Sequence, residues 1–398
     1  MNGKQFGILL ALVVVLGGAG LMLYKKSSSS WSGGGTAVGQ KLLGEFDVNA
    51  VTQIHVKHGP NELLLAKKGD LWRVTQRGDY PANFPEISSL LLKLKDMKVV
   101  QSEAIGQSQL PRLELVASGS NAPTNVELRD ESGKAIKTLV LGKKHMRKSQ
   151  GSPMGDMDDG GWPDGRYVQV GGAVDKVMLV SDSLANLEPN ADNWLNKDFF
   201  KIEKAKSIAV TFQIATNSWK LARETEGADL KLVDAKPGEE LDSAKASGVA
   251  NPLSSPSFAD VAVGVSPEAS GLDKPTVINV ETLDGFAYAV KVGAKTNDNF
   301  FLSMSVSANF VKERTPGADE KPEDKTKLDK EFADKLKKLE EKLTAEKAYE
   351  PWTYLVASWT VDSIIKERSH FMVEKKEEPK KEEGKEEPSP VPPAEEKK

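Results

Sequence analysis

The sequence contains no cysteine among its 398 residues. Disulfide bonds, thiolate catalysis, cysteine-ligated zinc and lipid attachment to an N-terminal cysteine are therefore excluded. An excess of positive charge is lacking too, because 54 basic residues stand against 58 acidic ones, a formal net charge of −4. Proteins that attract nucleic acid concentrate positive charge on one face, and the sequence has no basic stripe interleaved with aromatic residues. We expect no nucleic-acid partner.

Motifs of common enzyme chemistry are also missing. The sequence has no G-x-S-x-G elbow, Walker A loop or dinucleotide-binding fingerprint. The four histidines, His55, His58, His145 and His370, form no HExxH spacing and have no evident third ligand nearby. Surface or rim positions are expected for them. We therefore expect no enzyme activity, no catalytic residues, no metal site and no cofactor.

One acidic stretch, residues 155–165 (GDMDDGGWPDG), is the best remaining candidate for metal chemistry. Its carboxylates could gather around calcium, which takes about six to eight oxygen ligands. As an EF-hand loop that begins at Asp156 it fails, because its fifth position is Gly160 and its twelfth is Tyr167, where a bidentate glutamate is needed. A solvated loop is the simpler interpretation, and an ion site is the alternative.

The N-terminus carries one long apolar segment. Residues 6–24 (FGILLALVVVLGGAGLMLY) contain no charge, and as a helix rising about 1.5 Å per residue they would cover about 28 Å, close to the hydrocarbon core of a bilayer. A cleaved signal peptide would have a shorter apolar region before a small-residue site, whereas Leu23 and Tyr24 run directly into Lys25 and Lys26. We predict an uncleaved transmembrane anchor, with a cleaved signal and a buried helix as alternatives.

The remaining chain divides by composition. Residues 25–41 are rich in Ser and Gly, as flexible linkers are. Residues 374–398 alternate Lys/Glu blocks with proline and have almost no apolar residue, so they cannot offset the entropy of ordering. We predict a cytoplasmic N-terminus at 1–5, a linker at 25–41 and a disordered charged tail at 374–398. The positive charges on the two sides of residues 6–24 are too similar to set the orientation.

Strand-like segments recur in the same order at an offset of about 155 residues, which indicates two tandem domains rather than a solenoid of short units. The corresponding segments are 53–57 and 207–212, 63–65 and 219–221, 71–73 and 230–232, 126–142 and 277–293, and 177–184 and 353–364. We predict a first domain over 42–200 and a second over 201–373.

Residues 78–97 (GDYPANFPEISSLLLKLKDM) predict a helix that covers the first sheet. The apolar positions follow the helical i, i+3, i+4, i+7 spacing, and they are Ile87, Leu90, Leu91, Leu94 and Met97. Asn83 and Glu86 resemble a capping box. An antiparallel sheet with one apolar face needs such a cover. The predicted fold is α+β: two tandem related domains of antiparallel β-sheet covered by amphipathic helices, preceded by one transmembrane helix. In the second copy, residues 248–267 show only a weak helical pattern.

The second domain carries an insertion at about residues 325–347. Its apolar residues, spaced by four, four, three and four, are Leu328, Phe332, Leu336, Leu339 and Leu343. Lys, Glu and Asp crowd the other faces, so the pattern predicts a charged helix with one narrow apolar seam. Both a surface helix on its own domain and a partner-docking or coiled-coil helix fit. About three heptads are short for an independent coiled coil.

Most tryptophans are expected in hydrophobic cores. Trp72 and Trp219 alternate with polar neighbours on their strands, which favours core positions over ligand stacking. Trp352 and Trp359 flank a strand-like segment and are interpreted in the same way. Trp194 stands just before the second copy, so packing between the domains is expected there.

In their order along the chain these motifs resemble the bacterial family catalogued as domain of unknown function 4340. The residues that carry the resemblance, besides the apolar N-terminus, are GDLWRV at 69–74, YPAN at 80–83 before the helix, GK at 133–134 before LVLGK at 139–143, YVQV at 167–170, and MLV at 178–180 before NWLNK at 193–197. Members of this family look like membrane-tethered proteins encoded beside the permease and the gliding-type auxiliary subunit of an ABC transport system. The resemblance implies an accessory role at the outer face of the cytoplasmic membrane, and it supplies no catalytic residues.

We therefore expect a non-enzymatic, single-pass, membrane-anchored accessory or scaffold protein of the bacterial cytoplasmic (inner) membrane, with most of the chain extracytoplasmic (periplasmic). Its expected partners are the membrane and ABC transporter permease or auxiliary subunits. A module that binds an envelope polysaccharide or peptide in the cleft between the copies is the alternative. A hydrolase that uses the acidic loop is a weaker third hypothesis.

Overall fold

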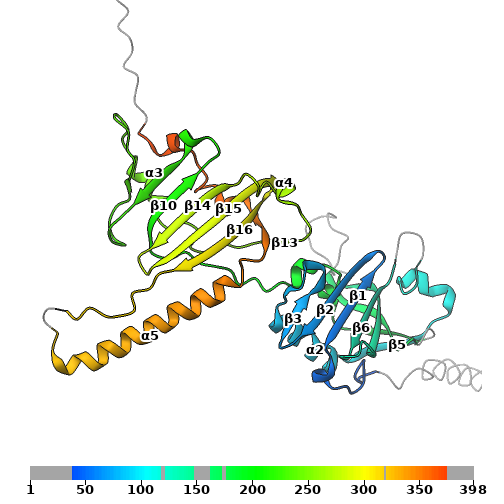
Figure 1. Ribbon diagram of the computed structural model, residues 1–398. Helices are drawn as coiled ribbons and strands as arrows, with labels where there is room; N and C mark the ends of the chain where they lie inside the picture. The colour runs from blue at the N-terminus through cyan, green and yellow to red at the C-terminus, as the bar shows by residue number, and fades with distance from the viewer. Residues whose placement is uncertain (1–37, 118–121, 148–161, 173–175, 318–319, 374–398) are drawn as a thin grey trace, which may run out of the picture.

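The computed structural model describes residues 38–117, 122–147, 162–172, 176–317 and 320–373. These residues form two antiparallel β-sheets that follow each other along the chain, with few helices (Figure 1). The predicted anchor at 6–24 and the predicted tail at 374–398 lie outside the described residues. Within the described ranges, no helix has the length and apolar character needed to cross a bilayer.

The first sheet has nine strands in the order β4-β3-β2-β1-β6-β7-β8-β9-β5. They are β1 (Gln53–His58), β2 (Asn61–Lys68), β3 (Leu71–Val74), β4 (Tyr80–Pro81), β5 (Val99–Ala104), β6 (Thr124–Arg129), β7 (Ala135–Arg147), β8 (Trp162–Val170) and β9 (Lys176–Val180). Alternate residues point to opposite faces, as Ile54 and Val56 in the core and Lys57 outside illustrate. The predicted three-stranded meander is present as β1 to β3, and the alternating pattern missed β5.

The second sheet has eight strands in the order β12-β11-β10-β14-β15-β16-β17-β13. They are β10 (Ala205–Thr211), β11 (Trp219–Ala222), β12 (Lys231–Leu232), β13 (Asp260–Ala262), β14 (Thr276–Thr282), β15 (Phe286–Thr296), β16 (Asn299–Ala308) and β17 (Thr353–Ala357). Matched in chain order, β10 to β12 repeat β1 to β3, β13 repeats β5, and β14 to β17 repeat β6 to β9. The predicted tandem repeat is therefore confirmed at the level of strand order. We call the parts built on the two sheets the first and the second domain.

Helix α2 (Phe84–Asp96) covers the apolar face of the first sheet, as its sequence predicts. The side chain of Asn83 caps it by accepting a hydrogen bond from the Glu86 backbone N–H at 3.4 Å. The buried residues of the helix are Ile87, Leu90, Leu91 and Leu94. The apolar stripe of α2 therefore packs against the sheet, and the helix has a structural role in the core.

The prediction that amphipathic helices cover both sheets holds only in part for the second one: the C-terminal half of α5 (Pro322–Lys347) packs on its core, but no long helix takes the place of α2. The place of α2 is taken there by α3 (Ser243–Ser247), which is too short to cover a sheet. The chain that follows α3 covers part of the sheet. The C-terminal part of the domain, which forms α6 (Ser358–Val361) and the 3-10 turn η7 (Arg368–Phe371), completes the cover. Phe371 lies against Trp219 with ring centroids 4.6 Å apart, and Trp219 Nε1 donates to the Lys366 carbonyl at 2.7 Å.

Short elements link the strands. They are the helix α4 (Pro267–Ser270) and the 3-10 turns η1 (Val48–Ala50), η2 (Thr75–Arg77), η3 (Gln107–Leu113), η4 (Ala185–Leu187), η5 (Ala191–Trp194) and η6 (Ala215–Asn217). At the N-terminal end, Gly39 donates a backbone hydrogen bond to Val99 at 2.8 Å. Residues 38–41 of the predicted flexible linker therefore bridge to the start of β5, although residues 38–40 are exposed.

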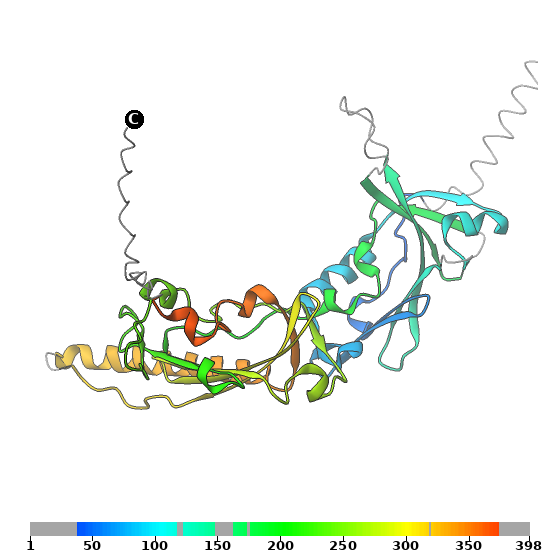
Figure 2. The same cartoon turned by 90° about the horizontal axis from the view of Figure 1, so that it is seen from above.

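Helix α5 (Pro322–Lys347) is inserted between β16 and β17. Its 26 residues correspond to a length of about 39 Å. Leu339 and Leu343 pack against the core, and Glu346 is buried. The C-terminal half is therefore a surface helix on its own domain, whereas the N-terminal half runs past the edge of the sheet in both ribbon views (Figures 1 and 2).

The two domains meet through aromatic side chains, and one continuous hydrophobic core includes residues of both. Tyr80 of β4 is 2% exposed and contacts Trp352 and Phe258 of the second domain, with ring centroids 5.0 and 5.8 Å away. Burial raises the pKa of the Tyr80 hydroxyl well above its usual range. Beside this cluster, Arg77 Nε and Nη2 donate to the Asp260 carboxylate at 2.6 and 2.7 Å. A bidentate pair of this kind fixes orientation as well as distance. The junction is thus a packed interface.

The tryptophans divide into buried and exposed positions. Trp72 and Trp219 are 5% and 2% exposed, which confirms their predicted core positions. Trp194 is buried where the chain leaves the first domain. Trp352 packs on Tyr80 at the junction. The prediction was wrong for Trp359, which is 67% exposed because it lies on the outward side of the short helix α6.

Candidate functional site

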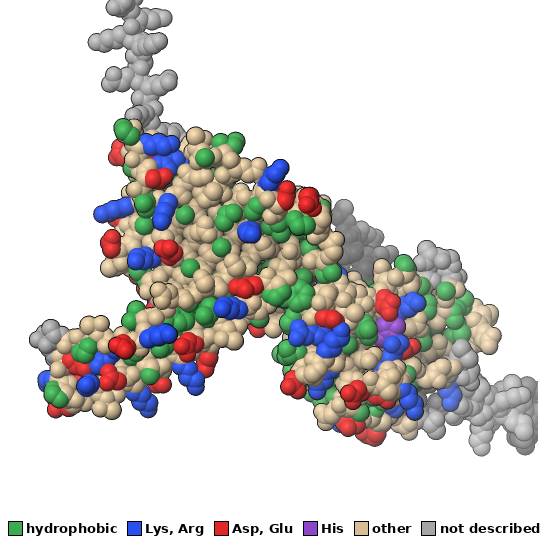
Figure 3. Space-filling view, viewed as in Figure 1, with side chains coloured by type: hydrophobic (Ala, Val, Ile, Leu, Met, Phe, Trp, Pro, Cys, Tyr) green, Lys and Arg blue, Asp and Glu red, His purple; other side chains and the backbone are tan. Residues whose placement is uncertain are grey.

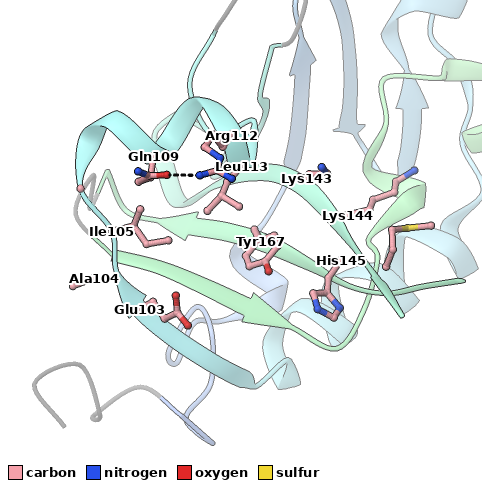
Figure 4. Close-up of a pocket in the computed structure, with 12 residues that line it drawn as sticks. Glu103, Ala104, Ile105, Gln109, Arg112, Leu113, Lys143, Lys144, His145 and Tyr167 are labelled. Atoms are coloured by element: carbon pink, nitrogen blue, oxygen red, sulfur yellow. Dashed lines mark hydrogen bonds between the residues drawn. The ribbon is translucent and has the colours of Figure 1, made fainter. Parts of the chain in front are cut away.

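A cavity of about 720 Å³ is lined in part by the end of β5, a strand that lies on the side of the first domain away from the second (Figure 1). We call this cavity the trough. Its lining residues come from the end of β5, from η3, from β7 and from β8 (Figure 4): Glu103, Ala104, Ile105, Gly106, Gln109, Arg112, Leu113, Lys143, Lys144, His145, Met146 and Tyr167.

The trough lies on the face of the first sheet opposite α2. Val168 of β8 belongs to the main core beneath α2, whereas its neighbour Tyr167 joins a second small cluster around Leu110, Leu115 and Val177. Because adjacent strand residues point to opposite faces, this second cluster sits on the outer face. It holds η3 against the sheet and thereby forms one wall of the trough.

Gly142 allows η3 to cross so close to β7. A Cβ atom added at Gly142 would lie 2.3 Å from the Leu113 carbonyl oxygen, a distance that no side chain can occupy. Behind this crossing, the Arg166 side chain is buried and its Nε donates to the Gly142 carbonyl at 2.9 Å. Burial lowers the pKa of the Arg166 guanidinium from its usual value. The wall is therefore fixed by a backbone contact and by a buried guanidinium.

The rim of the trough carries four basic side chains, and two of them contact a carboxylate. Lys144 Nζ lies 3.0 Å from Glu188 Oε1, and His145 Nδ1 lies 2.6 Å from Asp164 Oδ1. Arg112 donates to the Gln109 side-chain oxygen at 3.2 Å, a neutral partner. Among the residues that the structure describes, neither Arg112 nor Lys143 has a carboxylate within ion-pair distance. In Figure 4 these two side chains lie on the same side of the trough.

The chemistry of this lining is that of binding. Ile105, Leu113 and Tyr167 provide an apolar and aromatic floor, and the rim provides cations. Pockets of roughly 300–1,000 Å³ with an apolar lining and a few placed polar groups are typical ligand sites. Among the residues that the structure describes, His145–Asp164 is the one histidine–carboxylate contact at the rim, and the lining includes no serine, threonine or cysteine. The arrangement can hold a ligand with acidic groups.

The other histidines occupy the positions predicted for them. His55 lies on the outer face of the first sheet, where its Nε2 is 2.6 Å from Glu62 Oε1 and its Nδ1 accepts from Arg129 Nη2 at 2.8 Å. His58 Nδ1 is 3.1 Å from the Thr124 hydroxyl oxygen. Each is engaged in local polar contacts.

The acidic stretch is described only from Trp162 onward, where it forms the start of β8. Asp156, Asp158 and Asp159, on which the alternative of an ion site rests, lie outside the described residues. In the described part of the chain, no three His, Asp or Glu side chains are grouped closely enough to hold a metal ion.

A second hollow, of about 310 Å³, lies where α5 leaves the second domain. The apolar seam of α5 forms one side of it with Phe332 and Leu336, and Phe310 and Val311 form the other. Val311 is 71% exposed. Figure 3 shows charged side chains crowded over α5, whereas the adjacent face of the second sheet is mostly uncharged. The seam predicted from the sequence is therefore partly covered by its own domain and partly open.

His145 lies at the rim of the trough, as expected for a surface or rim histidine, but the sequence did not predict that the lining residues come together. The nearest signal in the sequence is the basic run Lys143 to Arg147 on a strand that continues beyond its apolar part. Arg112 and Tyr167 carry no comparable signal, because they join this run only through the crossing of η3 and the pairing of β7 with β8.

A family model described as "Domain of unknown function (DUF4340)" matches residues 72–151 and 159–275. The chain belongs to this family. The match in this DUF4340 member runs from β3 to the residue before β14, so it includes the trough residues and, at the domain junction, Tyr80 and Phe258 but not Trp352. Comparison with curated proteins and with solved structures found no match.

Proposed function

We propose that this DUF4340 member is a single-pass, membrane-anchored extracytoplasmic accessory or scaffold protein. It acts through protein contacts, as an auxiliary component of an ABC-type transport complex at the bacterial inner membrane. The uncharged segment at 6–24 supports the anchor, because its length matches a bilayer core. The family resemblance supports the transporter as partner.

The observation that carries the proposal is the junction between the domains. Interfaces between domains of one chain are by default small and polar, and they allow relative motion. Here the Arg77–Asp260 pair and the aromatic cluster of Tyr80, Phe258 and Trp352 lock the two sheets together. A rigid body of this size on a membrane tether is suited to hold partner proteins at a fixed position. Helix α5 and the strands that line the trough lie at opposite ends of it (Figure 2).

Co-purification of the full chain from membranes tests the proposal. The protein is extracted in mild detergent, isolated, and its stoichiometric companions are identified by mass spectrometry. Recovery of ABC permease or auxiliary subunits supports it. Extraction of the chain as a monomer under conditions that keep a known transporter intact contradicts it. A parallel variant without residues 6–24 is expected to leave the membrane fraction.

The ligand-binding module remains the second candidate, and the trough favours it. The ligand would not lie between the copies, because packed aromatic side chains fill the junction. It would lie about one domain away, in the cavity of about 720 Å³. A chain that is purified without partners and retains an envelope glycan or peptide would favour this function over the first.

A further inference from the structure

The trough has one side on which basic side chains stand without a paired carboxylate among the described residues. The sequence has a net charge of −4, whereas the rim of the trough presents Arg112 and Lys143 without carboxylate partners among the described residues. Lys144 is paired with Glu188 at 3.0 Å, and His145 contacts Asp164 at 2.6 Å. One carboxylate, Glu103, faces the cavity at the β5 end (Figure 4). The side formed by Arg112 and Lys143 is therefore suited to an anion.

The floor of the trough selects against a fully hydrophilic anion. Ile105 and Leu113 contribute apolar side chains, and Met146 is 44% exposed at the rim. Free phosphate would satisfy the cations and leave this surface in contact with water. Tyr167 is half-buried in the small cluster with Leu110 and Val177, so it belongs to the apolar part of the lining. Acidic groups next to apolar side chains fit both parts of the lining.

We propose that the trough binds an acidic peptide segment of a partner protein, with carboxylates on Arg112 and Lys143 and an apolar side chain over Leu113 and Tyr167. The inference rests on the proposed function, because it takes the occupant to be a protein. It goes beyond it by naming the contact surface and the chemistry of the partner. The wall is held by the Gly142–Leu113 crossing, so the site is formed before the peptide binds and ordering costs little on this side.

Fluorescence anisotropy with designed peptides tests the site. The full chain in lipid nanodiscs is titrated against three fluorescein-labelled hexapeptides that alternate Phe with Glu, Gln or Lys, and empty nanodiscs serve as the blank. We expect the Glu peptide to bind at least about tenfold more tightly than the Gln peptide, the Lys peptide not to bind, and the preference for Glu to weaken with salt. Equal binding of the Glu and Gln peptides would overturn the proposal.

Variants locate the binding. Arg112→Gln and Lys143→Gln change exposed side chains, so the fold should survive, and unchanged circular dichroism verifies this. The double variant is expected to lose about tenfold in affinity for the Glu peptide, whereas Lys231→Gln on β12 of the second domain is the matched control and should lose none. An unchanged affinity in the double variant, or tighter binding of a galacturonate oligosaccharide than of the Glu peptide, would overturn the proposal.

The same variants separate this inference from the proposed function. If permease subunits co-purify equally with the unchanged chain and with the double variant, and the unchanged chain does not bind the Glu peptide, the trough proposal fails and the accessory function stands. If the Glu peptide binds through Arg112 and Lys143 and no transporter subunit co-purifies, the trough proposal stands and the accessory function fails.

Discussion

The two domains have the same strand order and different covers. In the first, one helix of 13 residues, α2, supplies the apolar side chains that close the sheet. In the second, α3 has only 5 residues, and the C-terminal segment up to Phe371 replaces most of what α2 does. Burial of apolar area is non-directional, so the sheet can be closed by any segment that brings enough of it. The strand order is the common feature of the two copies, and the cover is exchangeable.

A second shared feature is the crossing on the outer face. A Cβ at Gly142 would lie 2.3 Å from the Leu113 carbonyl oxygen, and a Cβ at Gly293, the matching position on β15, would lie 2.2 Å from the Ser270 carbonyl oxygen. Both copies therefore pass a segment over the sheet at the same place. The segments differ in size, since η3 has 7 residues and α4 has 4. The longer crossing, with a β7 of 13 residues against 11 in β15, builds the trough in the first domain.

Removing one large side chain from each cover is expected to give the largest effects. Phe371→Ala should lower the free energy of unfolding by about 4 kcal/mol and Leu90→Ala by about 3 kcal/mol, because each leaves a cavity between cover and sheet. Both side chains are fully buried, at 1% exposure. Urea denaturation measures the change in the free energy of unfolding. Hydrogen exchange then shows which sheet loses protection. Protection lost equally from both sheets would mean that the covers do not act domain by domain.

Filling the shared crossing should cost somewhat less. Gly142→Ala and Gly293→Ala each place a Cβ against a backbone carbonyl, which cannot rotate away, and overpacking of this kind costs about 1–3 kcal/mol. Gly227→Ala is the control, because nothing lies within 4 Å of its Cβ position. Thermal unfolding compares the three. A cost at Gly142 without one at Gly293 would show that the crossings are not equivalent.

The domain junction comes next in expected size. Arg77→Ala removes a bidentate partner of Asp260 when both side chains are about three-quarters buried, at 26% and 24% exposure. Hydrogen bonds to charged groups contribute roughly 1.5–3 kcal/mol, and partial exposure places this pair at the lower end. A double-mutant cycle with Asp260→Ala isolates the coupling. A coupling near zero would leave the aromatic cluster alone to join the domains.

Local periodicity made part of this fold readable from the sequence. The spacing of Ile87, Leu91 and Leu94 predicts α2 because a helix repeats every 3.6 residues and buries one face. The alternation around Ile54 and Val56 predicts β1 in the same way. The repeat could be found because both copies preserve these short-range patterns. β16 alternates Leu302 and Met304 with serine and was still missed.

The trough and the cover of the second sheet could not be predicted from the sequence. Arg112, Lys143 and Tyr167 come from three segments, and only the register of β7 with β8 and the crossing at Gly142 bring them together. Such long-range geometry leaves no periodic trace in the sequence. The exposure of Trp359 was misjudged for a related reason, because its neighbours suggested a strand and the chain turns into α6 instead.

The smallest expected effect concerns the pH dependence of the second domain's cover. Arg368 Nη2 and Nε bind the Glu239 carboxylate at 2.7 and 3.0 Å and lower the pKa of Glu239 from 4.5 to about 2. A carboxyl with a lowered folded-state pKa contributes stability above about pH 4.5 and loses it as the pH falls toward 2. We expect η7 to gain hydrogen exchange between pH 4.5 and 2.5 relative to α2, whose ion pairs, Lys93–Asp182 and Asp96–Lys41, are more exposed than the Arg368–Glu239 pair. Glu239→Gln should remove this part of the pH dependence. If η7 and α2 change in parallel in both proteins, the ion pair does not fasten the cover.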